Sequence, residues 1–83
     1  MYKLVLSVRA RRELRKLKRT YQSAIISALE EIKDDPLVGK PLTRELTGKF
    51  SFRVGVFRIV YKINTKDNII SIITAGHRSR VYN

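Results

Sequence analysis

Two arginines in the segment FRVGVFRIVY, residues 52–61, could act together on an anion. If Gly55 and Val56 form a two-residue hairpin turn, Arg53 lies directly across from Arg58 on one face of a sheet. Like charges at such opposed positions are destabilising by about 0.2–1 kcal/mol. Guanidinium groups also bind phosphate oxygens through paired hydrogen bonds. The arginine pair therefore indicates a site that holds an anion.

The same hairpin register places two lysines on the arginine face. Lys49 would pair with Lys62, while the aromatic and aliphatic residues that alternate with these cations point to the opposite face. A shift of one residue would mix the two sets, so the pattern supports this register. We expect one apolar face that packs on the core. The other, concave face carries Lys49, Arg53, Arg58 and Lys62 and is called the cationic face below.

The segments around this hairpin predict a single α+β domain over residues 1–83. Residues 2–7 alternate as a strand, and Ser7 can cap a helix that begins near Val8 and runs to Arg19. After a break at residues 20–21, a second helix spans about residues 22–33 and stops at Pro36. A loop and three strands follow, the last over residues 69–75. The predicted order is β-α-α-β-β-β, a helical hairpin packed on a twisted, mainly antiparallel sheet.

The composition favours a polyanionic partner. The formal net charge is +11 on 83 residues, which points first to nucleic acid, next to an acidic protein, and only distantly to an anionic membrane. The sequence has no cysteine and a single histidine, so we expect neither disulfides nor a metal site. No apolar run is long enough for a membrane span, and no signal peptide is visible. A cytoplasmic location is expected.

Four segments, in this order, resemble the RelE/ParE toxin superfamily. They are LVLSVRARRELRKL, ALEEIKDDPLVGKPLTRELTG, FSFRVGVFRIVYKI and AGHRSRVY, and together they span essentially the whole chain. The resemblance implies a RelE-like fold and a toxin of a type II toxin–antitoxin pair. It also implies one of two targets, because toxins of the RelE branch cut messenger RNA in the ribosomal A site whereas those of the ParE branch poison DNA gyrase.

The resemblance also implies a set of catalytic residues. RelE-like enzymes use lysine, arginine and a late tyrosine, and by position Arg58, Arg78, Tyr82 and Lys49 match that set. The implied reaction is attack of the RNA 2′-hydroxyl on the adjacent phosphorus, with no metal or cofactor. Ser51 stands where some members carry a second lysine, which leaves the identity of the general base open.

Further cations are candidates for contact with the RNA backbone. These are Arg53, Lys62, Arg44, Arg9, Arg12, Lys16 and Arg19. His77 is a second-line candidate acid or base, because an unperturbed histidine titrates at about pH 6.5. Neighbouring side chains on a strand point to opposite faces, so His77 should point away from the face that Arg78 shares with the other cations.

We therefore expect a ribosome-dependent messenger-RNA endoribonuclease that an acidic, partly disordered antitoxin holds inactive. Its partners would be that antitoxin, the ribosome and messenger RNA. Two alternatives stay open: a ParE-like inhibitor of DNA gyrase, and a degenerate, non-catalytic toxin that acts as a binding module. The matched Arg58, Arg78 and Tyr82 favour the nuclease.

Overall fold

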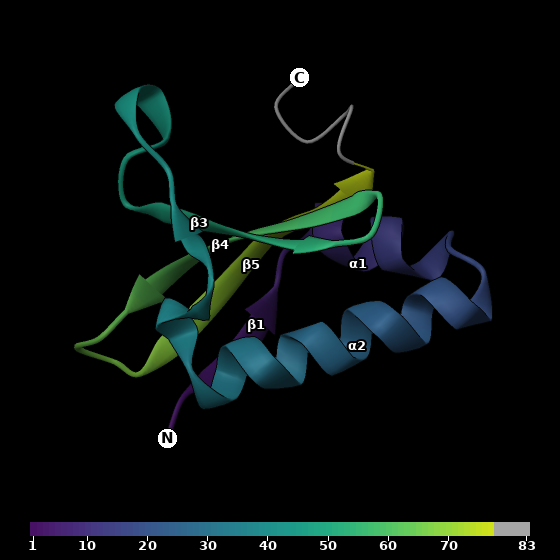
Figure 1. Ribbon diagram of the computed structural model, residues 1–83. Helices are drawn as coiled ribbons and strands as arrows, with labels where there is room; N and C mark the ends of the chain where they lie inside the picture. Colours follow the sequence, from purple (N-terminus) through teal and green to yellow (C-terminus); the bar gives the residue numbers. More distant parts are fainter. Residues whose placement is uncertain (78–83) are drawn as a thin grey trace.

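Two helices pack on one face of a five-stranded sheet in the computed structural model, which describes residues 1–77 (Figure 1). The elements are β1 (Lys3–Leu6), α1 (Val8–Arg15), α2 (Arg19–Asp34), η1 (Pro36–Val38), β2 (Lys40–Pro41), η2 (Arg44–Leu46), β3 (Lys49–Val54), β4 (Phe57–Asn64) and β5 (Ile69–His77), where η marks a short 3-10 helix. The strand order is β1-β5-β4-β3-β2, with β1 parallel to β5 and the other neighbours antiparallel. The predicted α+β class with a mainly antiparallel sheet is confirmed.

Ser7 joins β1 to α1, as the sequence predicted. Its Oγ accepts a hydrogen bond from the Ala10 N–H at 2.9 Å, which caps the helix. The same hydroxyl donates to the Ile73 carbonyl at 2.6 Å, so the start of α1 is tied to β5.

The break between the helices falls earlier than predicted. α1 ends at Arg15, and α2 already begins at Arg19, which therefore belongs to the second helix. The side-chain amide of Gln22 donates to the Leu14 carbonyl at 2.9 Å, which satisfies a group left open at the end of α1. This contact between helices has no signature in local sequence periodicity. From the short turn, α2 runs back under the sheet (Figure 1).

The core lies between α2, the buried start of α1 and the apolar side of the sheet. α2 contributes Ile25, Ala28, Leu29 and Ile32, α1 contributes Ala10, and β4 and β5 contribute Phe57, Ile59, Tyr61, Ile70, Ile72 and Ala75. Residues of this set alternate along β4, as a strand with one covered face requires. Among residues 1–77, no helix is long and apolar enough to cross a membrane.

Tyr61 fixes the start of the segment between α2 and β3. Its side chain is fully buried; the hydroxyl donates to the Pro36 carbonyl at 2.6 Å and accepts from the Gly39 N–H at 3.0 Å. The chain directly after Gly39 pairs with β3 as the short strand β2. The loop predicted over residues 36–48 therefore contains a short strand, β2, that the sequence did not predict, and its other ordered parts are two 3-10 turns.

The β3–β4 hairpin has the predicted register. Gly55 and Val56 form the turn, with Gly55 at a positive φ of 58° that the first turn position can require of glycine. Arg53 is the cross-strand partner of Arg58 and Lys49 that of Lys62. On the other side, the rings of Phe50 and Tyr61 stack with centroids 5.6 Å apart.

β5 extends to His77, two residues beyond the predicted end. Its register against β4 shifts between Val60 and Tyr61, which pair with Thr74 and Ile72 respectively. Ile73 is thus the extra residue of a bulge. Because of the bulge, Thr74 lies on the side of Val60 and the cationic face, while Ile72 packs in the core.

Candidate anion-binding site

The cationic face lies on the side of the sheet opposite to the core. Its cross-strand pairs are Lys49 with Lys62 and Arg53 with Arg58, so cations oppose cations in both rows. The row between them is uncharged in β3 and β4, where Ser51 pairs with Val60. Arg58 is half-buried and its Nε atom is shielded from solvent, whereas Arg53 is exposed. Clustered guanidinium and ammonium groups of this kind can hold a phosphate and stabilise charge that develops on it.

A pocket of about 390 Å³ opens on this face. It is lined by Val38, Lys40, Ser51, Phe52, Arg53 and Arg58. Lys40 was not predicted as a site residue, although β2 places it opposite Ser51. A strand of only two residues shows no alternating pattern that a sequence could reveal. Its second residue, Pro41, is compatible with an edge strand but does not predict one.

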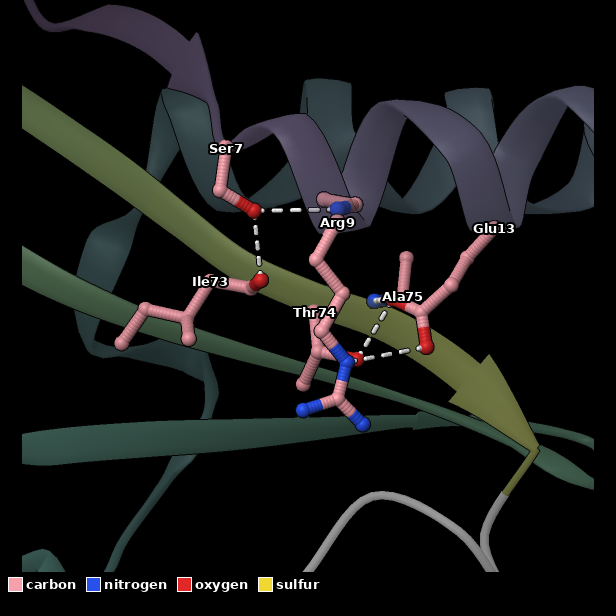
Figure 2. Close-up of polar contacts among 7 residues, drawn as sticks. Ser7, Arg9, Glu13, Ile73, Thr74 and Ala75 are labelled. Carbon is pink, nitrogen blue, oxygen red and sulfur yellow. Dashed lines mark hydrogen bonds and ion pairs between the residues drawn. The ribbon is translucent and has the colours of Figure 1, made fainter.

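Glu13 of α1 closes the edge of β5 beside the cationic face. β1 ends at Leu6, and beyond that point the Glu13 carboxylate accepts from the Ala75 N–H at 3.0 Å and the Thr74 hydroxyl at 2.6 Å. Arg9 Nε lies 3.5 Å from the other carboxylate oxygen. Figure 2 shows these side chains directed from α1 onto the strand. The Glu13 side chain thus provides the hydrogen-bond acceptor for β5 at the point where β1 has ended and no longer pairs with it.

Gly76 leaves the room that this carboxylate occupies. It pairs with Arg58 on β4, and a Cβ added there would collide with Glu13 Oε2. From the sequence, Gly76 is expected to release the C-terminal segment and to place Arg78 at the mouth of the cationic face. Its observed role is to bring the Glu13 carboxylate to the row that contains Arg58.

The remaining predicted residues fall into separate places. Arg12 and Lys16, with Arg15, line a shallow depression of about 550 Å³ along α1. Arg44 is exposed on η2, and Arg19 is exposed at the first turn of α2. Arg78 and Tyr82 lie outside the described residues, so their predicted roles are untested.

His77 is placed apart from the cationic face. It pairs with Phe57, a core residue, and their rings meet edge to face with centroids 6.1 Å apart. Its side of the sheet is therefore opposite to that of Arg58.

Among the titratable groups of residues 1–77, Tyr61 is the one whose pKa is clearly shifted. Burial raises its pKa, the hydrogen bond from Gly39 lowers it, and the charge of Asp35 raises it further. Within residues 1–77, no group of three His, Cys, Asp or Glu side chains lies close enough to hold a metal ion.

The sequence of this chain matches the model of a known protein family. The family model described as "ParE toxin of type II toxin-antitoxin system, parDE" matches residues 4–82. The chain belongs to the ParE toxin family. The predicted RelE/ParE superfamily membership is thus confirmed, and the cationic face is part of a toxin fold.

Individual relatives agree with this family. The chain is 37% identical to Toxin RelG of Mycobacterium tuberculosis (strain ATCC 25618 / H37Rv) over 83 residues, 98% of this chain and 95% of the relative. It matches a chain of the RelBE2 toxin–antitoxin complex of M. tuberculosis with a TM-score of 0.84 and 38% identity, covering 93% of this chain and 98% of that one. The isolated E. coli RelE toxin matches with a TM-score of 0.80 and 26% identity, over 99% of this chain and 92% of that one.

Proposed function

We propose that this ParE-family toxin is a ribosome-dependent messenger-RNA endoribonuclease. The observation that carries the proposal is the pairing of Arg53 with Arg58 and of Lys49 with Lys62 on one side of the sheet. A strand pair that only packs a core gains nothing from opposed cations, because each pair is repulsive without an anion. The backbone of RNA supplies such an anion at every nucleotide.

The proposed reaction needs no group beyond those of the RNA and the toxin. The RNA 2′-oxygen forms a bond to phosphorus as the bond to the 5′-oxygen breaks, which leaves a cyclic phosphate and a 5′-hydroxyl. One proton leaves the 2′-hydroxyl and another reaches the leaving oxygen. Arg58 would stabilise the extra charge on phosphorus, since its half-buried guanidinium is already in position.

Other residues would assist this step. Lys49 is a candidate base beside the phosphate, and Arg78 and Tyr82 complete the set by their match to the family pattern. Arg53 and Lys62 would hold the neighbouring backbone. The basic surface of Arg12 and Lys16 on α1 would contact ribosomal RNA without sequence readout.

We further propose that a separate antitoxin keeps the toxin inactive. The relative in the RelBE2 complex was solved together with an antitoxin. A chain of net charge +11 attracts an acidic partner, and that attraction speeds association and sharpens partner choice. The complex should associate more slowly as salt rises, because salt screens these charges.

The test is primer extension on messenger RNA in a translating extract. The parent protein should produce fragments, and Arg58→Ala should reduce the cleavage rate by at least about 10²-fold, the loss seen when one preorganised charge stabiliser is removed. Lys66→Ala is the control, because Lys66 is exposed in the β4–β5 turn and belongs to none of the basic surfaces proposed to contact RNA. The free energies of unfolding of both variants should match that of the parent protein. An Arg58→Ala protein that cuts at the parent rate contradicts the site.

The ends of the fragments test the chemistry separately. Attack by the 2′-hydroxyl predicts cyclic phosphate or 3′-phosphate on one fragment and a 5′-hydroxyl on the other. A 5′-phosphate would instead indicate activated water as the nucleophile, and would refute this mechanism while leaving a nuclease in place.

A gyrase inhibitor is the second candidate, because the matching family is named for ParE toxins. That function predicts no fragments in the translating extract. It predicts inhibition of supercoiling by purified DNA gyrase, which the proposed nuclease should leave unchanged.

A further inference from the structure

We propose that Lys40 forms, with Ser51 and Arg53, a second phosphate-binding subsite beside Arg58. The subsite would hold the RNA phosphate next to the one that is cut, so this inference rests on the proposed function. It assigns a role to β2, a strand that sequence patterns do not predict.

The sheet register brings Lys40 to the site. Lys40 pairs with Ser51 and Ser51 pairs with Val60, so the three residues form the row between the two rows of opposed cations. Partners across antiparallel strands project to the same side. Lys40 therefore supplies the one cation of this row, at its outer end, and lines the 390 Å³ pocket with Arg53 and Arg58.

The backbone just before Lys40 is firmly held. Tyr61 is fully buried and its hydroxyl bonds both the Pro36 carbonyl and the Gly39 N–H. The Leu42 N–H donates to the Lys49 carbonyl at 2.8 Å on the other side of β2. Lys40 thus projects from a strand fixed at both ends. Only its side chain loses freedom on binding, which limits the entropic cost of a phosphate contact.

The charge of the pocket selects a polyanion. Among the described residues, its lining contains three cations, Lys40, Arg53 and Arg58, and no acidic side chain. A row of phosphates satisfies several spaced cations at once, and the Ser51 hydroxyl can donate a hydrogen bond to a phosphate oxygen. The pocket volume lies near the lower end of the range for ligand sites, about 300–1,000 Å³.

The test measures binding apart from cleavage. The probe is a fluorescent RNA hexanucleotide whose 2′-hydroxyls are methylated, so that it cannot be cut. Lys40→Met should weaken its binding about 10-fold or more, as expected for loss of a hydrogen bond between charged groups. Lys66→Met is the control, because Lys66 is an exposed lysine in the β4–β5 turn. It should change the affinity less than about 2-fold, the range typical of surface positions away from a contact.

Two further measurements separate a phosphate contact from a structural role. The slope of log affinity against log salt is negative, and loss of one phosphate contact to a single strand should reduce its magnitude by about 0.7. Lys40→Arg should retain both slope and affinity. In the Lys40→Met background, Ser51→Lys should regain binding, because residue 51 lies directly across from residue 40.

The outcomes distinguish this subsite from the proposed nuclease. Equal binding by Lys40→Met and Lys66→Met, or an unchanged salt slope, would overturn the subsite even if the parent cleaves RNA. Either result would exclude RNA as the ligand of Lys40. If the parent does not cleave but the Lys40→Met protein shows the predicted binding loss, the subsite stands and the nuclease proposal fails.

Discussion

Replacing Tyr61 by phenylalanine removes a single buried oxygen from the link between the core and β2. The hydroxyl donates to Pro36 at 2.6 Å and accepts from Gly39 at 3.0 Å, and the side chain has no exposed surface. The ring itself remains, together with its stacking on Phe50 at 5.6 Å. Packing is therefore preserved, and the perturbation is confined to two hydrogen bonds.

The expected loss of unfolding free energy follows from the two backbone groups that lose their hydrogen-bond partner. A buried donor or acceptor without a partner costs about 1–3 kcal/mol, and here the Gly39 N–H and the Pro36 carbonyl both lose one. Water that enters the small space of the missing oxygen limits the loss, so we expect about 2–3 kcal/mol of unfolding free energy. For a chain of this size the melting temperature should fall by about 8–24 °C.

Urea denaturation followed by circular dichroism measures this loss. Tyr21→Phe is the matched control, because Tyr21 is 46% exposed and makes no hydrogen bond through its hydroxyl to the described residues. It should remain within about 0.5 kcal/mol of the parent. The Tyr61→Phe protein should also bind the methylated hexanucleotide more weakly, since Gly39 precedes Lys40.

A Tyr61→Phe protein as stable as the Tyr21→Phe control would refute the role of the hydroxyl in holding η1 and β2. A loss of stability with unchanged hexanucleotide binding would instead show that β2 keeps its position without this link. Equal slopes of the unfolding free energy against urea are needed for either comparison, because a changed slope reports a changed surface exposure on unfolding.

Gly76→Ala should cost about 1–3 kcal/mol, because the new Cβ displaces the Glu13 carboxylate from the Thr74 hydroxyl and the Ala75 N–H. In a Glu13→Ala background the same substitution should cost far less, and equal costs in both backgrounds would contradict the collision. The dependence of the unfolding free energy on alkaline pH tests the raised pKa of Tyr61. Burial raises its pKa above the ordinary 10.0, so the folded state keeps the phenolic proton more tightly. The stability that this tighter proton binding adds to the folded state is fully present below about pH 10, and it is lost as the pH rises through the folded-state pKa. Urea titrations should show this fall in the parent and not in Tyr61→Phe, and parallel curves would argue against the shift.

The central hairpin could be predicted from the sequence because its determinants are local. A period-2 alternation flanks Gly55, and only one register separates the aromatic residues from the four cations. Ser7 is likewise a local signal, since an N-cap bonds a backbone N–H within the same turn. The predicted role of the cationic face depends on its chemistry with RNA and stays a prediction.

The sequence alone could not place contacts between distant segments. The earlier helix break depends on Gln22 reaching the Leu14 carbonyl, and the edge of β5 depends on Glu13 reaching Ala75, 62 positions away. Neither pairing alters a periodic pattern. Each forms because a backbone group that is withdrawn from water needs a partner, and proximity in space decides which side chain supplies it.

The amino-acid sequence by itself determined which residues share a strand face, and hence the opposition of Arg53 and Arg58. Only the tertiary structure decided that Lys40 lies on the same face, in the pocket with Arg53 and Arg58. Its position is set by the buried hydroxyl of Tyr61, which holds Gly39 from 22 positions away. Alternation along a strand is a property of neighbouring residues, whereas the pairing of an edge strand requires the core on which both strands are built.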